Sequence, residues 1–185
     1  MPPIINIIDA IPLSPRDRES VLHHLEQSFG VPARLSSSTI DLQRAFDNGR
    51  HQFSSTALLT QLLDLEINGD EKVIALVGVD LFIPILTFVF GEAQLDGQAA
   101  IVSIHRLTNQ FYGIEEDAIL KRERLTKEII HEAGHTFGLK HCRQFECVMR
   151  SSTYVEEIDV KRMDLCTECR GLFNHHLAEI NHSHR

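Results

Sequence analysis

The eleven residues HEAGHTFGLKH at positions 131–141 constrain the fold of this 185-residue chain more than any other segment. His131 and His135 are four positions apart, so they share one face of a helix. Gly138 predicts the end of that helix, because glycine tolerates the left-handed conformation that ends helices. A turn at Gly138 can then bring His141 back toward the first two histidines. We therefore expect a helix, a sharp turn and a returning chain here.

The spacing within this segment is typical of a metal site. Two histidines at i and i+4 can bind one zinc ion, and the residue between them, Glu132, can serve as a general base. With this composition, H-E-x-x-H alone arises by chance in about one chain in twenty, and the full segment in about one in several thousand. Three neutral imidazoles with an open position for water form a catalytic zinc site. The competing interpretation, surface or packed histidines, fits a single histidine better than three together.

The segment lies at the end of the longest predicted helix, residues 115–139. Apolar residues recur there at intervals of four, at Leu125, Ile129, Ala133 and Phe137, and form one stripe. Each of the first two histidines of the segment lies two residues, about 200° around the helix axis, beyond a member of this stripe. The stripe can therefore pack on a sheet while the histidines face away from it.

The first hundred residues alternate between strand and helix patterns. We expect strands at residues 5–11, 31–35, 73–79, 86–90 and 99–107, with 73–79 in the centre of the sheet. We expect one helix between an N-cap at Ser14 and a stop at Gly30, and another over residues 53–66. A last helix is expected near residues 167–180. The alternation predicts an α/β arrangement with a mostly parallel sheet.

All four cysteines lie in the C-terminal quarter of the chain: Cys142, Cys147, Cys166 and Cys169. Their close spacing allows a four-thiolate zinc site or two disulfides. The apolar first thirteen residues lack a basic segment and a small-residue cleavage site, so we expect no export signal and a cytoplasmic location. A reducing compartment favours zinc over disulfides. A nucleic-acid-binding zinc ribbon is the alternative use of such a site.

The charge balance limits the partners of the chain. The formal net charge of −8 argues against duplex nucleic acid and against the zinc-ribbon alternative, because phosphate contact depends on clustered Lys and Arg. The longest apolar run, residues 81–90, is too short to span a membrane and contains Pro84. We therefore expect no nucleic-acid or membrane partner. The chain is expected to be a monomer.

The extended histidine segment resembles the zinc motif of the metzincin metallopeptidases, H-E-x-x-H-x-x-G-x-x-H. That clan has a methionine-containing turn downstream, and Met149 follows His141 by eight residues. The cysteine placement, with a C-T-E-C pair at 166–169 after the methionine, resembles that of the archaemetzincins. The stretch VDLFIPILTFVFGEAQ at 79–94 is also similar to that family, more weakly.

The resemblance implies a metzincin-like α/β (α+β) fold in a single catalytic domain, residues 1–185. An upper half, residues 1–138, would hold a mixed twisted sheet with helices and end with the active-site helix. A small irregular lower half, residues 139–185, would hold the methionine turn, a four-cysteine zinc knuckle and a C-terminal helix. Met149 would lie beneath the catalytic zinc, although a simple core methionine predicts almost the same packing. Two zinc ions per chain are expected, one catalytic and one structural.

The expected activity is zinc-dependent hydrolysis of peptide bonds, with Glu132 as general base. Endopeptidase and aminopeptidase activity both fit the sequence. A substrate could add a strand beside residues 86–91, so Phe88, Val89, Phe90 and Gly91 are candidate substrate-binding residues; an ordinary buried strand fits them equally well. Tyr154 is a candidate oxyanion donor, but a packed or surface tyrosine explains this residue better. Four C-terminal histidines are candidate metal ligands, but a solvated tail explains them better (His175, His176, His182 and His184).

A second hypothesis belongs to another class of protein. The chain could be a zinc-stabilised binding protein whose histidine site is structural or unproductive. An intact Glu132 favours the peptidase, because a purely structural site of three histidines needs no base beside it.

Overall fold

The computed structural model describes residues 3–65 and 67–183, with side chains through residue 180. Its centre is a five-stranded sheet with the order β2-β1-β5-β8-β7. The first four strands run parallel, and β7 is antiparallel to β8 at the edge of the sheet. The strands are β1 (Ile5–Asp9), β2 (Ala33–Ser36), β5 (Lys72–Val77), β7 (Gly91–Ala93) and β8 (Ala99–Ser103). The mostly parallel sheet with β5 at its centre confirms the prediction.

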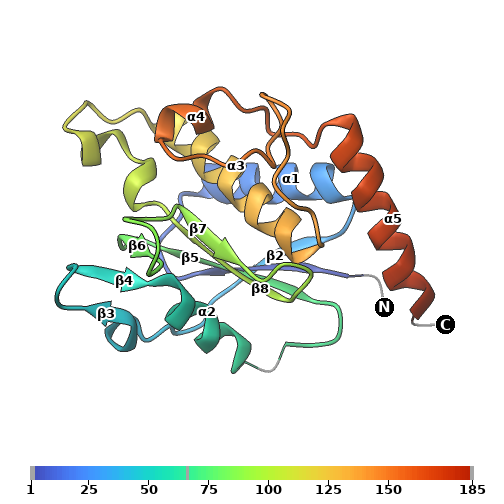
Figure 1. The fold of residues 1–185 in the computed structure, drawn as a ribbon, viewed down its shortest axis with the longest axis horizontal. Coiled ribbons are helices and arrows are strands. Elements are labelled where there is room, and N and C mark those ends of the chain that lie inside the picture. The colour runs from blue at the N-terminus through green and yellow to red at the C-terminus, as the bar shows by residue number, and fades with distance from the viewer. Residues whose placement is uncertain (1–2, 66, 184–185) are drawn as a thin grey trace.

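Helices cover both faces of this sheet (Figure 1). α1 (Pro15–Phe29) and α3 (Ala118–Thr136) pack on one face, and α2 (Ser55–Leu63) packs on the other. Strand β5 is buried throughout, and its side chains alternate between the two cores. Ile74 and Leu76 lie in the core under α1 and α3, whereas Ala75 lies in the core with α2. A strand that is apolar on both sides is typical of the middle of an α/β sheet.

The ends of α1 are those that the sequence predicts. The Ser14 hydroxyl accepts a hydrogen bond from Asp17 N, and Gly30 ends the helix with φ of 61°. α2 is shorter than predicted, because residues 52–54 form β4 (Gln52–Ser54) and Ser54 becomes its N-cap. Residue 66, the predicted end of that helix, lies outside the described residues.

The prediction of a strand over residues 86–90 was wrong. A small second sheet, β3 (Phe46–Asp47), β4 and β6 (Leu81–Phe82), lies beside the first. After β6 the chain turns, and only Val89 forms an isolated bridge, with Leu81. Two side chains take the carbonyl groups that a neighbouring strand would use. The Arg50 guanidinium donates to Pro84 O and Leu86 O, and a second donor, the side-chain amide of residue 52, bonds the carbonyl of residue 87.

α3 begins three residues later and ends three residues earlier than the predicted range 115–139. Asp117 is its N-cap and accepts from the N–H groups of Ile119 and Leu120. Two short 3₁₀ helices, His105–Leu107 and Asn109–Tyr112, precede it. Gly138 stops the helix with φ of 83°, as expected, and Leu139 N donates to Gly134 O.

The chain after Gly138 is mostly irregular, as predicted, with the short α4 (Val155–Asp159) and the C-terminal α5 (Thr167–Ser183). Phe173 of α5 packs against Phe29 of α1 and Phe137, with ring centroids 5.2 Å apart in both pairs. No helix among the described residues is long and apolar enough to cross a membrane.

One of the four C-terminal histidines is not a solvated tail residue. His176 is half-buried and its Nδ1–H donates to Phe137 O over 2.8 Å, because the end of α3 leaves that carbonyl without a helical partner. His175 is exposed beside Glu179, which agrees with the prediction. The side chains of His182 and His184 lie outside the described residues.

Candidate metal centre

The structure brings His131, His135 and His141 together. The first two lie one turn apart on α3, and their Nε2 atoms are 3.1 Å apart. The turn at Gly138 brings His141 back toward them, and its ring centroid lies 5.3 Å from that of His131 and 4.9 Å from that of His135. One ring nitrogen from each histidine lies within 4.8 Å of the others.

Backbone carbonyls fix the orientation of two of these rings. His131 Nδ1–H donates to Val148 O over 2.8 Å, and His135 Nδ1–H donates to Leu139 O over 2.7 Å. Protonation at Nδ1 leaves Nε2 with a free lone pair, which is the tautomer a metal ligand requires. His141 makes no side-chain hydrogen bond to any described residue, and its ring stacks on that of His131 at 26°.

All three imidazoles favour the neutral form. Burial, followed by the charge of Lys161, lowers the pKa of His131 well below its usual value. Burial also lowers the pKa of His135, despite its hydrogen bond to Leu139 O. His141 is more exposed, and partial desolvation of its ring together with the Lys161 charge lowers its pKa. Neutral imidazole is the form that binds metal ions.

Glu132 is 5% exposed and lies between α3 and the edge strand β7. Burial and the neighbouring Glu128 raise its pKa well above the usual value, while Lys161 acts against them. Gly91 of β7 leaves the space that this carboxylate occupies. A β-carbon on Gly91 would lie 2.7 Å from Glu132 Oε1.

A buried ion pair that sequence reasoning missed lies beside this carboxylate. Lys161 Nζ is 3.3 Å from Glu128 Oε1, and the two side chains are 1% and 4% exposed. Glu128 precedes Glu132 by one turn of α3, but Lys161 comes from the chain after α4. No local pattern in the sequence indicates that these two charges meet.

A cleft of about 280 Å³ opens beside these groups. Residues 86–91 and residues 151–153 line it, together with His131, His141, Glu128 and Glu132. Phe88, Val89, Phe90 and Gly91, the candidate substrate-binding residues, line this cleft, although not in one regular strand. Ser152 Oγ is buried without a hydrogen-bond partner among the described residues. Tyr154 is 65% exposed and is not among the residues that line the cleft.

Met149 packs directly under the histidine helix. Its side chain is fully buried, and a β-carbon on Gly134 would lie 2.4 Å from Met149 Sδ. Glycine at position 134 is therefore what allows the methionine to approach α3 so closely. Through this contact Met149 packs against the turn of α3 that lies between His131 and His135.

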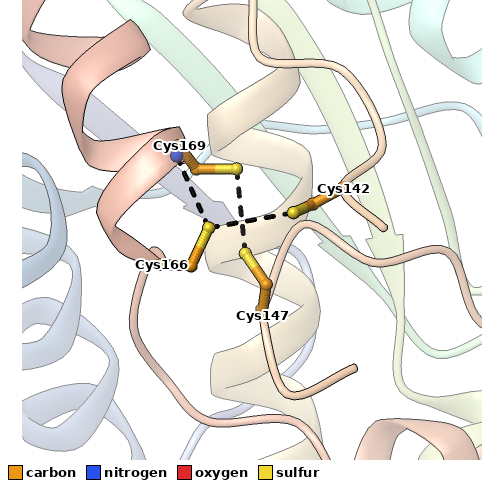
Figure 2. Close-up of side chains that lie close together, drawn as sticks. All are labelled: Cys142, Cys147, Cys166 and Cys169. Atoms are coloured by element: carbon orange, nitrogen blue, oxygen red, sulfur yellow. Dashed lines mark hydrogen bonds between the residues drawn. The ribbon is translucent and has the colours of Figure 1, made fainter. Parts of the chain in front are cut away.

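The four cysteines form a second cluster (Figure 2). Their side chains point toward one another, from the loop after α3 and from the start of α5. The Sγ atoms of Cys142 and Cys166 are 3.8 Å apart, as are those of Cys147 and Cys169. All four are free thiols, and all four Sγ atoms lie within 4.8 Å of one another.

The thiols of the cluster do not share one environment. Burial, and then repulsion from the Cys147 site, raises the pKa of Cys169 far above its usual value. Burial also raises the pKa of Cys147. Burial acts in the same direction on Cys166, but the N–H of Cys169 and the neighbouring thiols outweigh it and lower its pKa.

Both clusters suit zinc by the chemistry of their donors. Zinc binds imidazole nitrogen and thiolate sulfur, three histidines with an open position in catalytic sites and four cysteines in structural ones. The second cluster brings four thiols within 4.8 Å of one another, and the backbone N–H groups of Gln144 and Cys169 donate to two of them. Such a set is typical of a metal site rather than of an ordinary core.

Known proteins that resemble this chain in sequence and in structure are peptidases. The model of peptidase family M54 matches residues 20–175. The archaemetzincin of Methanocaldococcus jannaschii is 38% identical over 154 residues, which cover 82% of this chain and 84% of that protein. The crystal structure of the archaemetzincin from Methanopyrus kandleri superposes with a TM-score of 0.83 at 32% identity and covers 96% of each chain. A zinc-dependent peptidase from Methanocorpusculum labreanum superposes with a TM-score of 0.82 at 29% identity, over 93% of this chain and 100% of that one.

Proposed function

The chain belongs to peptidase family M54, the archaemetzincins, and on that premise we propose that Glu132 is the general base of its peptide hydrolysis. As a member of this family the protein is a zinc metallopeptidase, a hydrolase that acts on peptides or proteins. The observation that carries the proposal is the position of one buried carboxylate between β7 and three convergent imidazoles.

We assign His131, His135 and His141 to the catalytic zinc. Bound there, zinc would polarise the carbonyl of the scissile bond and lower the pKa of a water molecule. The hydrogen bonds from His131 and His135 to Val148 O and Leu139 O hold both rings in the ligand tautomer. The four cysteines are assigned to a second, structural zinc, which gives two ions per chain.

Glu132 has two tasks in this mechanism. Its carboxylate accepts a proton from the attacking water and then passes that proton to the leaving amine. The buried position suits the first task, because a raised pKa makes the carboxylate a stronger base. A carboxylate that holds a proton during one step of the reaction can deliver it in the next.

The edge strand β7 offers a place for an extended substrate. The residues on either side of β7 bond to β8: Phe90 O accepts from Ser103 N, and Gln94 N donates to Ala99 O. Bonding to one neighbour alternates along an antiparallel strand. The N–H and C=O groups of Gly91 and Ala93 then point to the open edge of the sheet. A substrate strand bonded to Gly91 would pass directly beside Glu132.

The chemistry of the cleft favours apolar substrate side chains. Leu86 and Phe88 line it together with the small hydroxyl side chains of residues 151–153. Among the residues that line it, Glu128 is paired with Lys161, so Glu132 is left as the carboxyl group without an ion-pair partner. Endopeptidase and aminopeptidase activity both fit this cleft. Monomeric state and cytoplasmic location stay predictions.

The substitution Glu132→Gln tests the mechanism. We expect peptide hydrolysis to fall by about 10²–10⁴-fold, the usual contribution of a general base, while zinc content stays unchanged. Glu19→Gln, an exposed change on α1, is the matched control and should keep full activity. Activity that survives Glu132→Gln would refute the assigned role. Lack of activity in the wild type with both metal sites filled would favour the zinc-stabilised binding protein instead.

A further inference from the structure

His141 is held differently from the other two histidines. His131 and His135 lie on α3 and each bonds a backbone carbonyl. His141 lies in irregular chain, is exposed, and makes no side-chain hydrogen bond to a described residue. Its position therefore depends on the segment of chain that carries it.

That segment is anchored at the very next residue. Cys142 N donates to Met149 O over 2.9 Å, and Cys142 Sγ accepts from Gln144 N over 3.4 Å. The same Sγ lies 3.8 Å from the Sγ of Cys166, the residue just before α5 (Figure 2). The third histidine is thus one peptide bond from a member of the cysteine cluster.

A second series of contacts connects the cysteine cluster to His131. Cys147 Sγ lies 3.8 Å from Cys169 Sγ of α5. The next residue is Val148, whose carbonyl accepts from His131 Nδ1–H. Met149 follows it under Gly134 of α3. Residues 147–149 therefore join the cluster to the helix that carries two histidines.

These cysteine contacts are weak without a metal. A thiol is a poor hydrogen-bond donor and acceptor, so pairs at 3.8 Å contribute little to the order of the loop. Four metal–sulfur bonds would instead fix the loop of residues 142–147 to α5. The loop would then be ordered before the histidine site binds its own ion.

From this arrangement we infer that the four-cysteine site is the positioning element for His141, so that metal at the cysteines raises metal affinity at the histidines. The inference rests on the proposed histidine site. Because binding free energies are reciprocal, metal at the histidines must raise affinity at the cysteines by the same factor. Cys166 and Cys169 act through Cys142 and Cys147 and touch none of the three histidines in the contacts described.

Cobalt titration of the full-length chain tests this coupling. The chelated protein is loaded with one equivalent of zinc for the cysteines, and Co²⁺ is then added while the ligand-field absorption of the histidine site is followed. His135→Ala identifies that absorption by abolishing it. In Cys166→Ser and Cys169→Ser we expect the Co²⁺ affinity of the histidine site to fall about 5–150-fold, the usual range for coupled sites.

The matched control is Phe173→Leu, which loosens the packing of α5 against Phe29 and Phe137 and leaves every thiol in place. Its Co²⁺ affinity at the histidines should equal that of the wild type. Equal losses in Phe173→Leu and in the cysteine variants would overturn the inference, because general loosening would then explain both. Wild-type affinity in both cysteine variants would also overturn it and would leave the proposed function intact.

A second measurement covers the case in which a cysteine variant fails to fold. By reciprocity, metal at the histidines should tighten Co²⁺ at the cysteines. At Co²⁺ concentrations that fill both sites of the wild type, a competing chelator should therefore remove the cysteine-bound ion, read from the thiolate-to-cobalt charge-transfer band, more readily from His135→Ala than from the wild type. An unchanged cysteine affinity would contradict the coupling. A wild-type chain that binds no Co²⁺ at the histidines would instead refute the proposed function itself.

Discussion

Glu132 lies against the backbone of Gly91, the first residue of the edge strand β7. A β-carbon at Gly91 would come within 2.7 Å of Glu132 Oε1 and 2.8 Å of its Cγ. On the other side the same β-carbon would meet Ile101 O at 2.7 Å. The hydrogen atom of a glycine is therefore what lets the carboxylate lie next to the strand along which we propose the substrate binds.

Gly91→Ala should displace this carboxylate. A misplacement of about 1 Å can cost a reaction about 10²-fold, so we expect kcat to fall by that order with zinc content unchanged. Gly171→Ala is the matched control, because a β-carbon there meets nothing within 4 Å. If Gly91→Ala retained the kcat of the control variant, the close contact would have no role in placing Glu132.

Lys161→Met should destabilise the fold strongly. The change leaves Glu128 as a buried charge without its partner, and breaking such a pair costs about 3–5 kcal/mol. Chemical denaturation measures the free energy of unfolding. The double variant Lys161→Met/Glu128→Gln removes both charges and should recover much of the loss. A Lys161→Met variant as stable as the wild type would show that the pair is not buried.

Met149→Leu and Met149→Ala separate packing from metal binding. The leucine variant keeps the volume and should lose less than about 1.5 kcal/mol. The alanine variant leaves a cavity under Gly134 and should lose about 2–5 kcal/mol. Zinc content should match the wild type in Met149→Leu. A loss of zinc in that variant would mean that the sulfur is a ligand.

Acid should weaken the fold through Asp80. Burial acts to raise the pKa of this carboxyl, but hydrogen bonds from Arg106 and Gln52 outweigh it and hold the pKa below the usual 3.8. A depressed folded-state pKa stabilises the protein above the unfolded value, and this stabilisation is lost as the pH falls through the folded value. The stability advantage of the wild type over Asp80→Asn should thus be constant above about pH 5 and shrink below pH 3.8. A difference that did not depend on pH would contradict the ion pair.

Local signals predicted the elements whose causes are local. Ser14 and Gly30 bound α1 as expected, because capping involves residues a few positions apart. The spacing of His131 and His135 placed both on one face of α3. Asp117 offered an equally local N-cap signal for the start of α3, and the prediction of residue 115 overlooked it.

The sequence could not predict features that depend on distant residues. The strand expected at 86–90 is replaced by a turn because Arg50, far along the chain, bonds its carbonyl groups. His176 caps α3 from a helix near the C-terminus. The meeting of Glu128 with Lys161 likewise needs the completed fold.

Metal content per chain tests the account most directly. Elemental mass spectrometry of protein purified without chelator should give about two zinc ions in the wild type and about one in His135→Ala. It would contradict the account to find about one zinc in the wild type that persists in His135→Ala and disappears in Cys166→Ser. The cysteine site alone would then bind metal, and the zinc-stabilised binding protein would be the better description.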